Sequence, residues 1–219
     1  MAKVKGGAIG DIVAYYATYY TSVVKPMPPA SERDPSWSDL EWQVRNWYNF
    51  TWLCGDSLVE LAIHSVDKVM WAMDDKPPAN CVAVGGRQVP SPGGNIFDHF
   101  EVNFEWENGI RAFLACRQMD NCYNENADYI MGTKGVCTIG RGTLPVITGE
   151  NPWRYRGEKN DMYQQEHDEL FASIRRGQPL NDGEWMSTST MAGIMGRMSA
   201  YTGQKLTWDQ AINSEDKLG

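Results

Sequence analysis

Residues 97–116 read FDHFEVNFEWENGIRAFLAC, and this stretch decides the fold class. Apolar and polar side chains alternate over its first half, which is the pattern of a strand with one buried face. The segment 107–109 is Glu-Asn-Gly, a turn favoured in hairpins because Asn and Gly readily adopt positive φ angles. We therefore expect an antiparallel pair of strands, with one face formed by Phe100, Val102, Phe104 and Trp106 and the other by His99, Glu101, Asn103 and Glu105.

Similar signals extend the sheet on both sides of this hairpin. Residues 12–24 are rich in β-branched and aromatic side chains, which favour strands. Further strands are expected at 80–84, 129–131, 136–139, 145–148 and 153–156, and helices at 39–48, 57–73, 162–176, 185–202 and from Thr207 onward. Strands in one run, with helices gathered elsewhere, predict an α+β fold in which an open, mainly antiparallel sheet has helices packed on one face. No linker or repeat divides the sequence, so we expect a single domain over residues 1–219.

The composition is that of an ordinary globular protein, with 219 residues, 42% hydrophobic side chains and a formal charge of −8. An acidic chain without a basic stripe is a poor partner for nucleic acid. Without a long apolar run or a Lys/Arg cluster it is not expected to bind membranes. The first seven residues do not resemble a secretory signal, so a cytoplasmic location is the default expectation, with a longer exported precursor as the alternative. The five cysteines include no C-x-x-C pair, which indicates reduced thiols.

The segment 57–73 carries the main chemical signal. It is apolar around nearly its whole circumference, which predicts a buried helix, yet Glu60, His64 and Asp67 interrupt it at positions i, i+4 and i+7. In a continuous helix this spacing places all three on one stripe, which Lys68 borders. Burying ionisable groups is costly unless they pair or face a polar cavity. We infer a partly wet cleft in which Glu60 or Asp67 orients the imidazole, and His64 accepts a proton from a substrate hydroxyl.

Other interpretations of these residues stay open. His64 can simply be hydrogen-bonded inside the core while the two acids reach solvent. Glu60 and His64 can share a metal ion if His99 or His167 supplies a third ligand. The aromatic run within 37–52 suits the C–H face of a sugar, but ordinary packing explains each ring singly. The glycine pairs of this sequence lie outside any strand–G-x-G-x-x-G–helix unit, so they predict no dinucleotide site.

Four further segments, taken in order, carry a resemblance to a known family. They are GAIGDIV at 7–13, GDSLVELAIHSVDKVMW at 55–71, IMGTKG at 130–135 and EHDELFASIRRGQPLN at 166–181. Together they resemble the C-terminal domain of the glucose-fructose oxidoreductase / inositol dehydrogenase / MocA-type family. The second segment is similar to the active-site helix of that family, in which an acid, a histidine and an aspartate precede a tryptophan. The resemblance covers nearly the whole chain.

This resemblance implies a fold and a role. Family members join an N-terminal Rossmann domain, which holds NAD or NADP, to an α+β domain that supplies part of the substrate pocket and the oligomer interface. By position, His64 corresponds to the acid–base histidine and is flanked by Asp67 and Glu60, although many members have Asp where this chain has Glu60. Trp47 and Tyr48 resemble an aromatic segment of the sugar-processing branch, so we expect them to bind substrate, together with Lys68, which borders the stripe of His64.

The sequence lacks the nucleotide-binding half of such an enzyme, and no Glu-Lys-Pro segment supplies the catalytic lysine of the family. We therefore expect residues 1–219 to be the substrate-binding and oligomerisation domain of an NAD(P)-dependent oxidoreductase acting on a sugar or polyol, inactive alone and without NAD or NADP bound to it. The alternatives are a non-catalytic carbohydrate-binding or assembly module and a metal-dependent enzyme. We also expect a homo-oligomer through the sheet face, with a candidate surface formed by Phe100, Phe104, Trp106 and Phe113 if no helix covers it.

Overall fold

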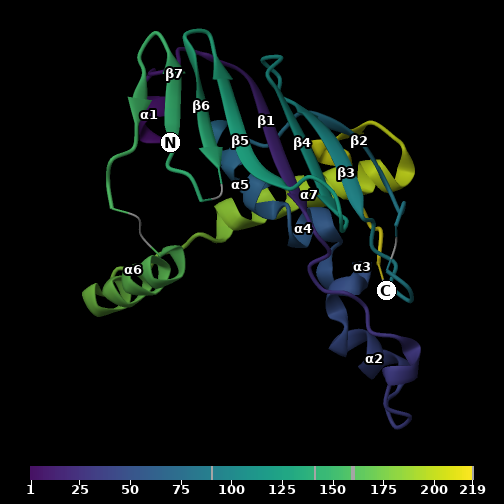
Figure 1. Ribbon diagram of the computed structural model, residues 1–219. Coiled ribbons are helices and arrows are strands. Elements are labelled where there is room, and N and C mark those ends of the chain that lie inside the picture. The colour runs from purple at the N-terminus through teal and green to yellow at the C-terminus, as the bar shows by residue number, and fades with distance from the viewer. Residues whose placement is uncertain (90, 141, 159–160, 219) are drawn as a thin grey trace.

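The computed structural model describes residues 1–89, 91–140, 142–158 and 161–218. Within them nine strands form one open sheet in the order β8-β7-β6-β5-β1-β4-β3-β2-β9 (Figure 1). Neighbouring strands are antiparallel, except that β1 and β4 are parallel. This confirms the predicted α+β class. The strands are β1 (Ile12–Thr21), β2 (Asn80–Gly86), β3 (His99–Glu105), β4 (Arg111–Gln118), β5 (Glu125–Gly132), β6 (Gly135–Gly140), β7 (Val146–Gly149), β8 (Trp153–Arg154) and β9 (Leu206–Thr207).

The β3–β4 hairpin forms as the alternation predicts. Val102 pairs with Leu114 in register, and both side chains are fully buried. Gly109 adopts a φ of 82° in the turn, a conformation that costs glycine no Cβ clash. The remaining inward side chains of β3 and its end, namely Phe100, Phe104 and Trp106, are also buried.

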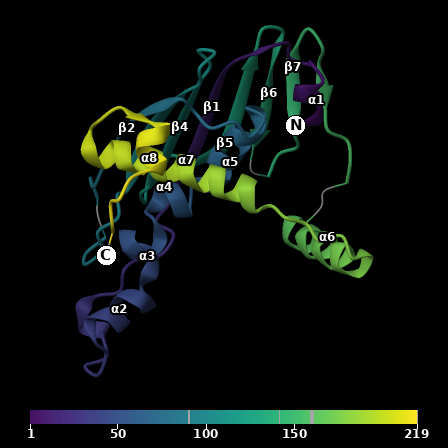
Figure 2. The same ribbon diagram turned by 180° about the vertical axis from the view of Figure 1, so that it is seen from behind.

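The covering helices all pack on that inward face of the sheet (Figures 1 and 2). They are α4 (Ser57–Glu60), α5 (Ile63–Ala72), α7 (Gly183–Thr202) and α8 (Trp208–Ile212). The α7 helix packs against β2 and β3. It approaches closely because Gly196 has no side chain: a Cβ there would lie 3.0 Å from Leu58 and 3.1 Å from Val102. The small residues of α7 therefore allow the tight contact between helix and sheet.

The opposite face of the sheet is uncovered, which corrects the predicted self-association surface. Phe100, Phe104 and Trp106 do not contribute to it, since the helices bury all three. Phe113 pairs with Tyr16 across β4 and β1 and belongs to the uncovered face. The error arose from phase, because a strand residue and its direct neighbour in sequence point to opposite faces. The uncovered face carries a row of side chains across the strands: Tyr129, Tyr16, Phe113, Asn103 and Val82.

The predicted continuous helix 57–73 is wrong, because two helices, α4 and α5, take its place. The N–H groups of both Leu61 and Ala62 bond to the carbonyl oxygen of Ser57 at 3.0 Å. The bond from Ala62 reaches back five residues instead of four, so the turn contains one additional residue. Glu60 and His64 consequently do not occupy one regular helical stripe.

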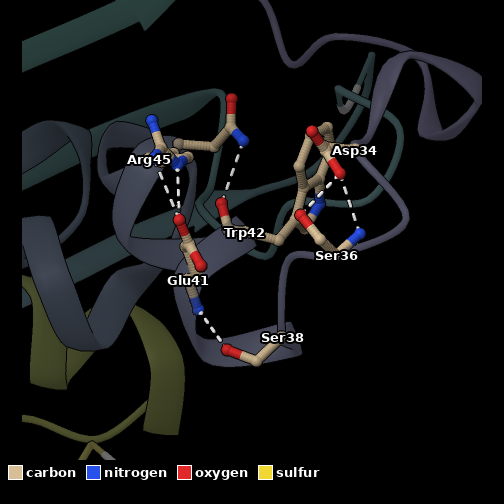
Figure 3. Close-up of polar contacts among 7 residues, drawn as sticks. Asp34, Ser36, Ser38, Glu41, Trp42 and Arg45 are labelled. Atoms are coloured by element: carbon tan, nitrogen blue, oxygen red, sulfur yellow. Dashed lines mark hydrogen bonds and ion pairs between the residues drawn. The ribbon is translucent and has the colours of Figure 1, made fainter.

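An arm projects from one end of the sheet, as Figure 1 shows. It contains the short helices η1 (Ala30–Glu32), α2 (Asp39–Arg45), η2 (Trp47–Asn49) and α3 (Thr51–Cys54). Ser38 caps α2 by accepting the N–H of Glu41 at 3.1 Å, and Arg45 donates to the same glutamate side chain (Figure 3). Asp34 accepts from Ser36 in the turn before the helix (Figure 3). These local bonds order the arm just before Trp47.

A second projection is α6 (Met162–Arg176), which stands away from the sheet (Figures 1 and 2). Its bounds match the predicted 162–176. Asp161 caps its start by accepting the N–H of Tyr163 at 3.0 Å, and Gly177 ends it in the left-handed conformation. The short helix α1 (Ala2–Lys5) lies at the N-terminus. No helix among the described residues has both the length and the apolar character that crossing a lipid bilayer requires.

Candidate functional site

His64 lies exposed on the first turn of α5, and its imidazole faces β1. Its ring is nearly parallel to that of Tyr19, with the ring centroids 6.3 Å apart. Tyr19 in turn lines a cavity of about 490 Å³ at the end of β1 and β5. The structure therefore leaves the imidazole in contact with solvent instead of sealing it in the core, whereas most of the cavity lining lies on the opposite, uncovered face of the sheet.

The lining of this cavity is polar and aromatic. Asn126 pairs with Tyr19 on the helix-covered face of the sheet, whereas Tyr20 pairs with Glu125 on the uncovered face, so the lining draws on both faces. Glu125 accepts a hydrogen bond from Thr18 at 2.7 Å and another from Tyr129 at 3.3 Å, which fixes its carboxylate at the rim. Amide, carboxylate and phenol groups can together donate to and accept from several hydroxyl groups.

Asp67, on the next turn of α5, is held by helix α7. One carboxylate oxygen, Oδ1, accepts the indole N–H of Trp185 and the hydroxyl of Ser189, each at 2.7 Å. Burial raises the pKa of Asp67, and the two hydrogen bonds and His64 oppose that rise. The predicted role of Asp67 in orienting the imidazole of His64 stays a prediction.

Glu60 lies in a different environment. It is half-buried, and burial raises its pKa while Lys25 opposes the rise. Burial also raises the pKa of Tyr48, with a further contribution from the charge of Glu60. Glu60 thus faces the base of the arm, near Lys25 and Tyr48, and its predicted alignment with His64 on one helical stripe is not present.

Trp47 and Tyr48 sit where the arm meets the sheet. The ammonium of Lys25 stands 4.6 Å above the centroid of the Trp47 ring, in a cation–π contact. Both aromatic residues line a second cavity, of about 350 Å³. Tyr48 is only 2% exposed and donates its hydroxyl to Gln118 at 3.2 Å. Trp47 is therefore the member of this pair that can offer a ring face to a ligand.

Lys68 binds a buried acid of the sheet. Its ammonium pairs with the carboxylate of Asp128 on β5, and Tyr15 donates its hydroxyl to the same carboxylate at 3.2 Å. Asp128 is 0% exposed, and burial raises its pKa although Lys68 opposes that rise. The predicted role of Lys68 in substrate binding stays a prediction, since the structure shows it tying α5 to the sheet.

The other two histidines lie away from this cluster. His99 pairs through Nδ1 with Asp98 at 2.7 Å, and Nδ1 of His167 is 2.7 Å from the carbonyl oxygen of Tyr163 within α6. In the part of the chain that the structure describes, no three His, Cys, Asp or Glu side chains gather in a way that could hold a metal ion. All five cysteines are free thiols.

Several residues of the site were not found by sequence reasoning. Trp185 and Ser189 approach Asp67 from 118 and 122 residues further along the chain. Asp128 reaches Lys68 from 60 residues away. Tyr19 and Asn126 lie side by side on the helix-covered face of β1 and β5. A polar residue such as Asp128 on a covered strand face was the one available signal, because buried charges require partners.

Comparison with known proteins gives one family match and several similar solved structures. The GFO/IDH/MocA C-terminal domain family matches residues 2–138. A comparison with curated protein sequences finds no match. Among solved structures, a putative oxidoreductase from Thermotoga maritima is similar, with a TM-score of 0.69 and 19% identity over 94% of this chain and 58% of that one. Levoglucosan dehydrogenase in complex with NADH and levoglucosan gives a TM-score of 0.72 and 14% identity over 95% of this chain and 62% of the other.

The aldose-aldose oxidoreductase from Caulobacter crescentus, complexed with glycerol, is also similar, with a TM-score of 0.68 and 16% identity over 94% of this chain and 58% of that one. At such identities these likenesses show the fold alone. The chain spans 58% to 62% of the length of these three proteins. The family match extends over more than half of the sequence and includes β1, α4, α5 and the β3–β4 hairpin. The chain therefore belongs to the GFO/IDH/MocA C-terminal domain family.

Proposed function

We propose that this chain is the substrate-binding domain of an NAD(P)-dependent oxidoreductase that acts on a hydroxyl group of a sugar or polyol. The observation that carries the proposal is the exposed imidazole of His64, which stacks on Tyr19 and lies three residues before Asp67 on the same helix. Family membership supports it. So do the structural neighbours, which include a UDP-N-acetylglucosamine 3-dehydrogenase from Acidithiobacillus ferrooxidans.

The chemistry that these residues can perform is proton transfer. His64 accepts the proton of a substrate hydroxyl, because a neutral imidazole carries a nitrogen lone pair that can take it and this ring is open to solvent. The imidazolium that forms lies in the field of the Asp67 carboxylate, which balances its charge. Glu60 is the second acid near the site. We place it on the side that faces the arm, where the charge of Lys25 lowers its pKa.

The groups near His64 favour a polyol as substrate. Asn126 offers an amide beside Tyr19 on the face that His64 shares, while Glu125 and Tyr20 add a carboxylate and a phenol at the same end of the strands on the opposite face. Sugars are held by such combinations, because every hydroxyl both donates and accepts. Trp47 and Tyr48 at the second cavity, together with Lys68, remain the predicted further substrate-binding residues.

The described residues do not fit a dinucleotide. The parallel pair of the sheet, β1 and β4, is separated in sequence by the arm, two helices and two antiparallel strands, not by one crossover helix with a glycine-rich first turn. We therefore place NAD or NADP on a separate nucleotide-binding domain of the complete enzyme, where the cofactor would accept hydride. The residues of this chain bind the substrate and move its proton, and the chain alone is expected to be inactive.

We further propose that residues 1–219 form one domain that self-associates through the uncovered face of the sheet. That face carries aromatic side chains, and Val84 on its outer strand is 63% exposed. A second copy laid on this face would cover the exposed apolar side chains.

Titration of the chain with levoglucosan, followed by NMR of the histidine rings, tests the proposed substrate site. The ring signals of His64 should shift saturably, whereas those of His99 and His167, which lie elsewhere, should not move. Unchanged His64 signals with levoglucosan, glucose and glycerol would contradict the proposal. Binding that persists undiminished in His64→Ala would instead favour the alternative, a carbohydrate-binding module without catalysis.

A further inference from the structure

Helix α7 holds the acid of the proposed His64–Asp67 pair through two hydrogen bonds. The indole N–H of Trp185 and the hydroxyl of Ser189 both end on Oδ1 of Asp67, each at 2.7 Å. The two donors are four residues apart and so lie on one face of α7. Ser189 is 3% exposed. Two short bonds to a single carboxylate oxygen fix the rotamer of the acid and leave its second oxygen for other groups.

Packing alone does not explain this arrangement. The ring of Trp185 also contacts that of Trp71, with the ring centroids 5.7 Å apart and the planes tilted by 43°. That contact would be equally available to a phenylalanine, which has no N–H. The donor of Trp185 and the hydroxyl of Ser189 are therefore features that the helix–helix contact itself does not need.

We propose that Trp185 and Ser189 are positioning residues of the site, which keep the carboxylate of Asp67 ionised and fixed beside His64 so that it can balance the imidazolium formed when His64 takes a substrate proton. This inference rests on the proposed function. It adds two residues of α7 to a site whose other groups come from α5 and the sheet. Preorganised charge is effective because it requires no reorientation during the reaction.

The electrostatic surroundings of Asp67 agree with this role. Burial raises its pKa, and the hydrogen bonds from Ser189 and then Trp185 are the largest opposing contributions. Of the charged groups that act on it, Asp75 raises the pKa and His64 lowers it, and both lie on or just after α5. Helix α7 contributes two neutral donors. Such donors stabilise the ionised form without adding a competing charge.

The first test measures the titration of Asp67 by carbon NMR of its carboxyl group. Hydrogen bonds to charged groups are strong enough that losing one should raise the pKa of Asp67 by about 1 pH unit in Trp185→Phe, and similarly in Ser189→Ala. Trp71→Phe is the matched control, because it makes the same ring replacement on the other side of the Trp71–Trp185 contact but removes no donor to Asp67. An unchanged pKa in Trp185→Phe, or an equal rise in Trp71→Phe, would overturn the proposal.

The second test follows the indole N–H signal of Trp185 in the wild-type chain. This signal should shift with pH as Asp67 titrates, and the shift should vanish in Asp67→Asn. A pH-independent signal would show that the hydrogen bond is absent and would overturn the proposal. Both readouts need no ligand, so they decide on the positioning role even if no sugar binds and the proposed function fails.

The third test asks whether the hydrogen bonds from Trp185 and Ser189 to Asp67 affect sugar binding. If the chain binds levoglucosan, Trp185→Phe should weaken that binding several-fold, whereas Trp71→Phe should bind as the wild type does. Melting temperatures of the two variants show whether both remain folded. Equal affinities of Trp185→Phe and the wild type would show that the hydrogen bond from Trp185 to Asp67 does not support substrate binding, and would overturn the inference.

Discussion

The ammonium of Lys68 binds the fully buried carboxylate of Asp128, which joins helix α5 to strand β5 directly beneath the turn that carries His64 and Asp67. Tyr15 donates to the same carboxylate from β1. The charge of Lys68, the residue after Asp67, therefore anchors helix α5 to the sheet. The ion pair therefore holds α5, and with it His64 and Asp67, against the sheet.

Removing one partner of the pair should destabilise the chain strongly. Lys68→Met keeps the apolar stem but leaves Asp128 buried without its counter-charge, a change that typically costs about 3 kcal/mol or more. Urea denaturation measures the free energy of unfolding. A loss below about 1 kcal/mol, the value typical of exposed ion pairs, would show that solvent reaches Asp128.

The double variant Lys68→Met with Asp128→Asn supplies the control for this prediction. Asparagine keeps an acceptor for Tyr15 but carries no charge, so the double variant should recover part of the stability lost in Lys68→Met. Strictly additive losses would mean that the two groups do not interact in solution.

Two helices show how far local sequence determines this structure. The bounds of α6 were predicted correctly because its signals are local: Asp161 caps the start and Gly177 ends the helix. The break between α4 and α5 carries no such signal, because residues 61 and 62 are Leu and Ala, and neither of them ends a helix as Gly or Pro does. There, packing against α7 and the sheet selects a turn that propensity does not favour.

The candidate site divides in the same way. The residue types and spacing of His64 and Asp67 were sufficient to select both, since ionisable groups in an apolar helix are costly. The partners of Asp67 and Lys68 could not be predicted, because they come from α7 and β5, across 60 or more residues of chain. The predicted alignment of Glu60 with His64 was wrong for a local reason, namely the additional residue in the turn at Ala62.

The stability of the chain should fall with rising pH through the titration of Glu60. Burial raises the pKa of Glu60 above its ordinary value of 4.5, so the folded chain binds this proton more tightly than the unfolded chain does. The resulting stabilisation is fully present below pH 4.5 and is lost as the pH rises through the raised value. In Glu60→Gln, urea denaturation at increasing pH should show a shallower decline.

Lys25→Met provides the matched comparison for that pH dependence. Lys25 lowers the pKa of Glu60, so its loss should raise this pKa further and make the decline steeper. A decline that is the same in wild type, Glu60→Gln and Lys25→Met would show that Glu60 does not contribute to it.

The uncovered face of the sheet should mediate self-association. Phe113→Lys places a charge at the centre of the aromatic row and should convert the assembly to monomers, as measured by light scattering. Tyr163→Glu is the control, since Tyr163 is an exposed aromatic side chain that lies on α6, away from the sheet. A wild-type chain that remains monomeric at tens of micromolar would refute the proposed interface.

His64 should limit turnover in the complete oxidoreductase, in which this domain works with a nucleotide-binding domain. General bases contribute rate factors of about 10² or more, so His64→Ala should reduce kcat by at least that factor. His99→Ala removes an imidazole that pairs with Asp98 at a distance from the site, and it should leave kcat close to that of the wild type. A reduction of only a few-fold in His64→Ala would refute the role of His64 as the base. In that case its exposed ring, stacked on Tyr19, would serve only to bind the substrate.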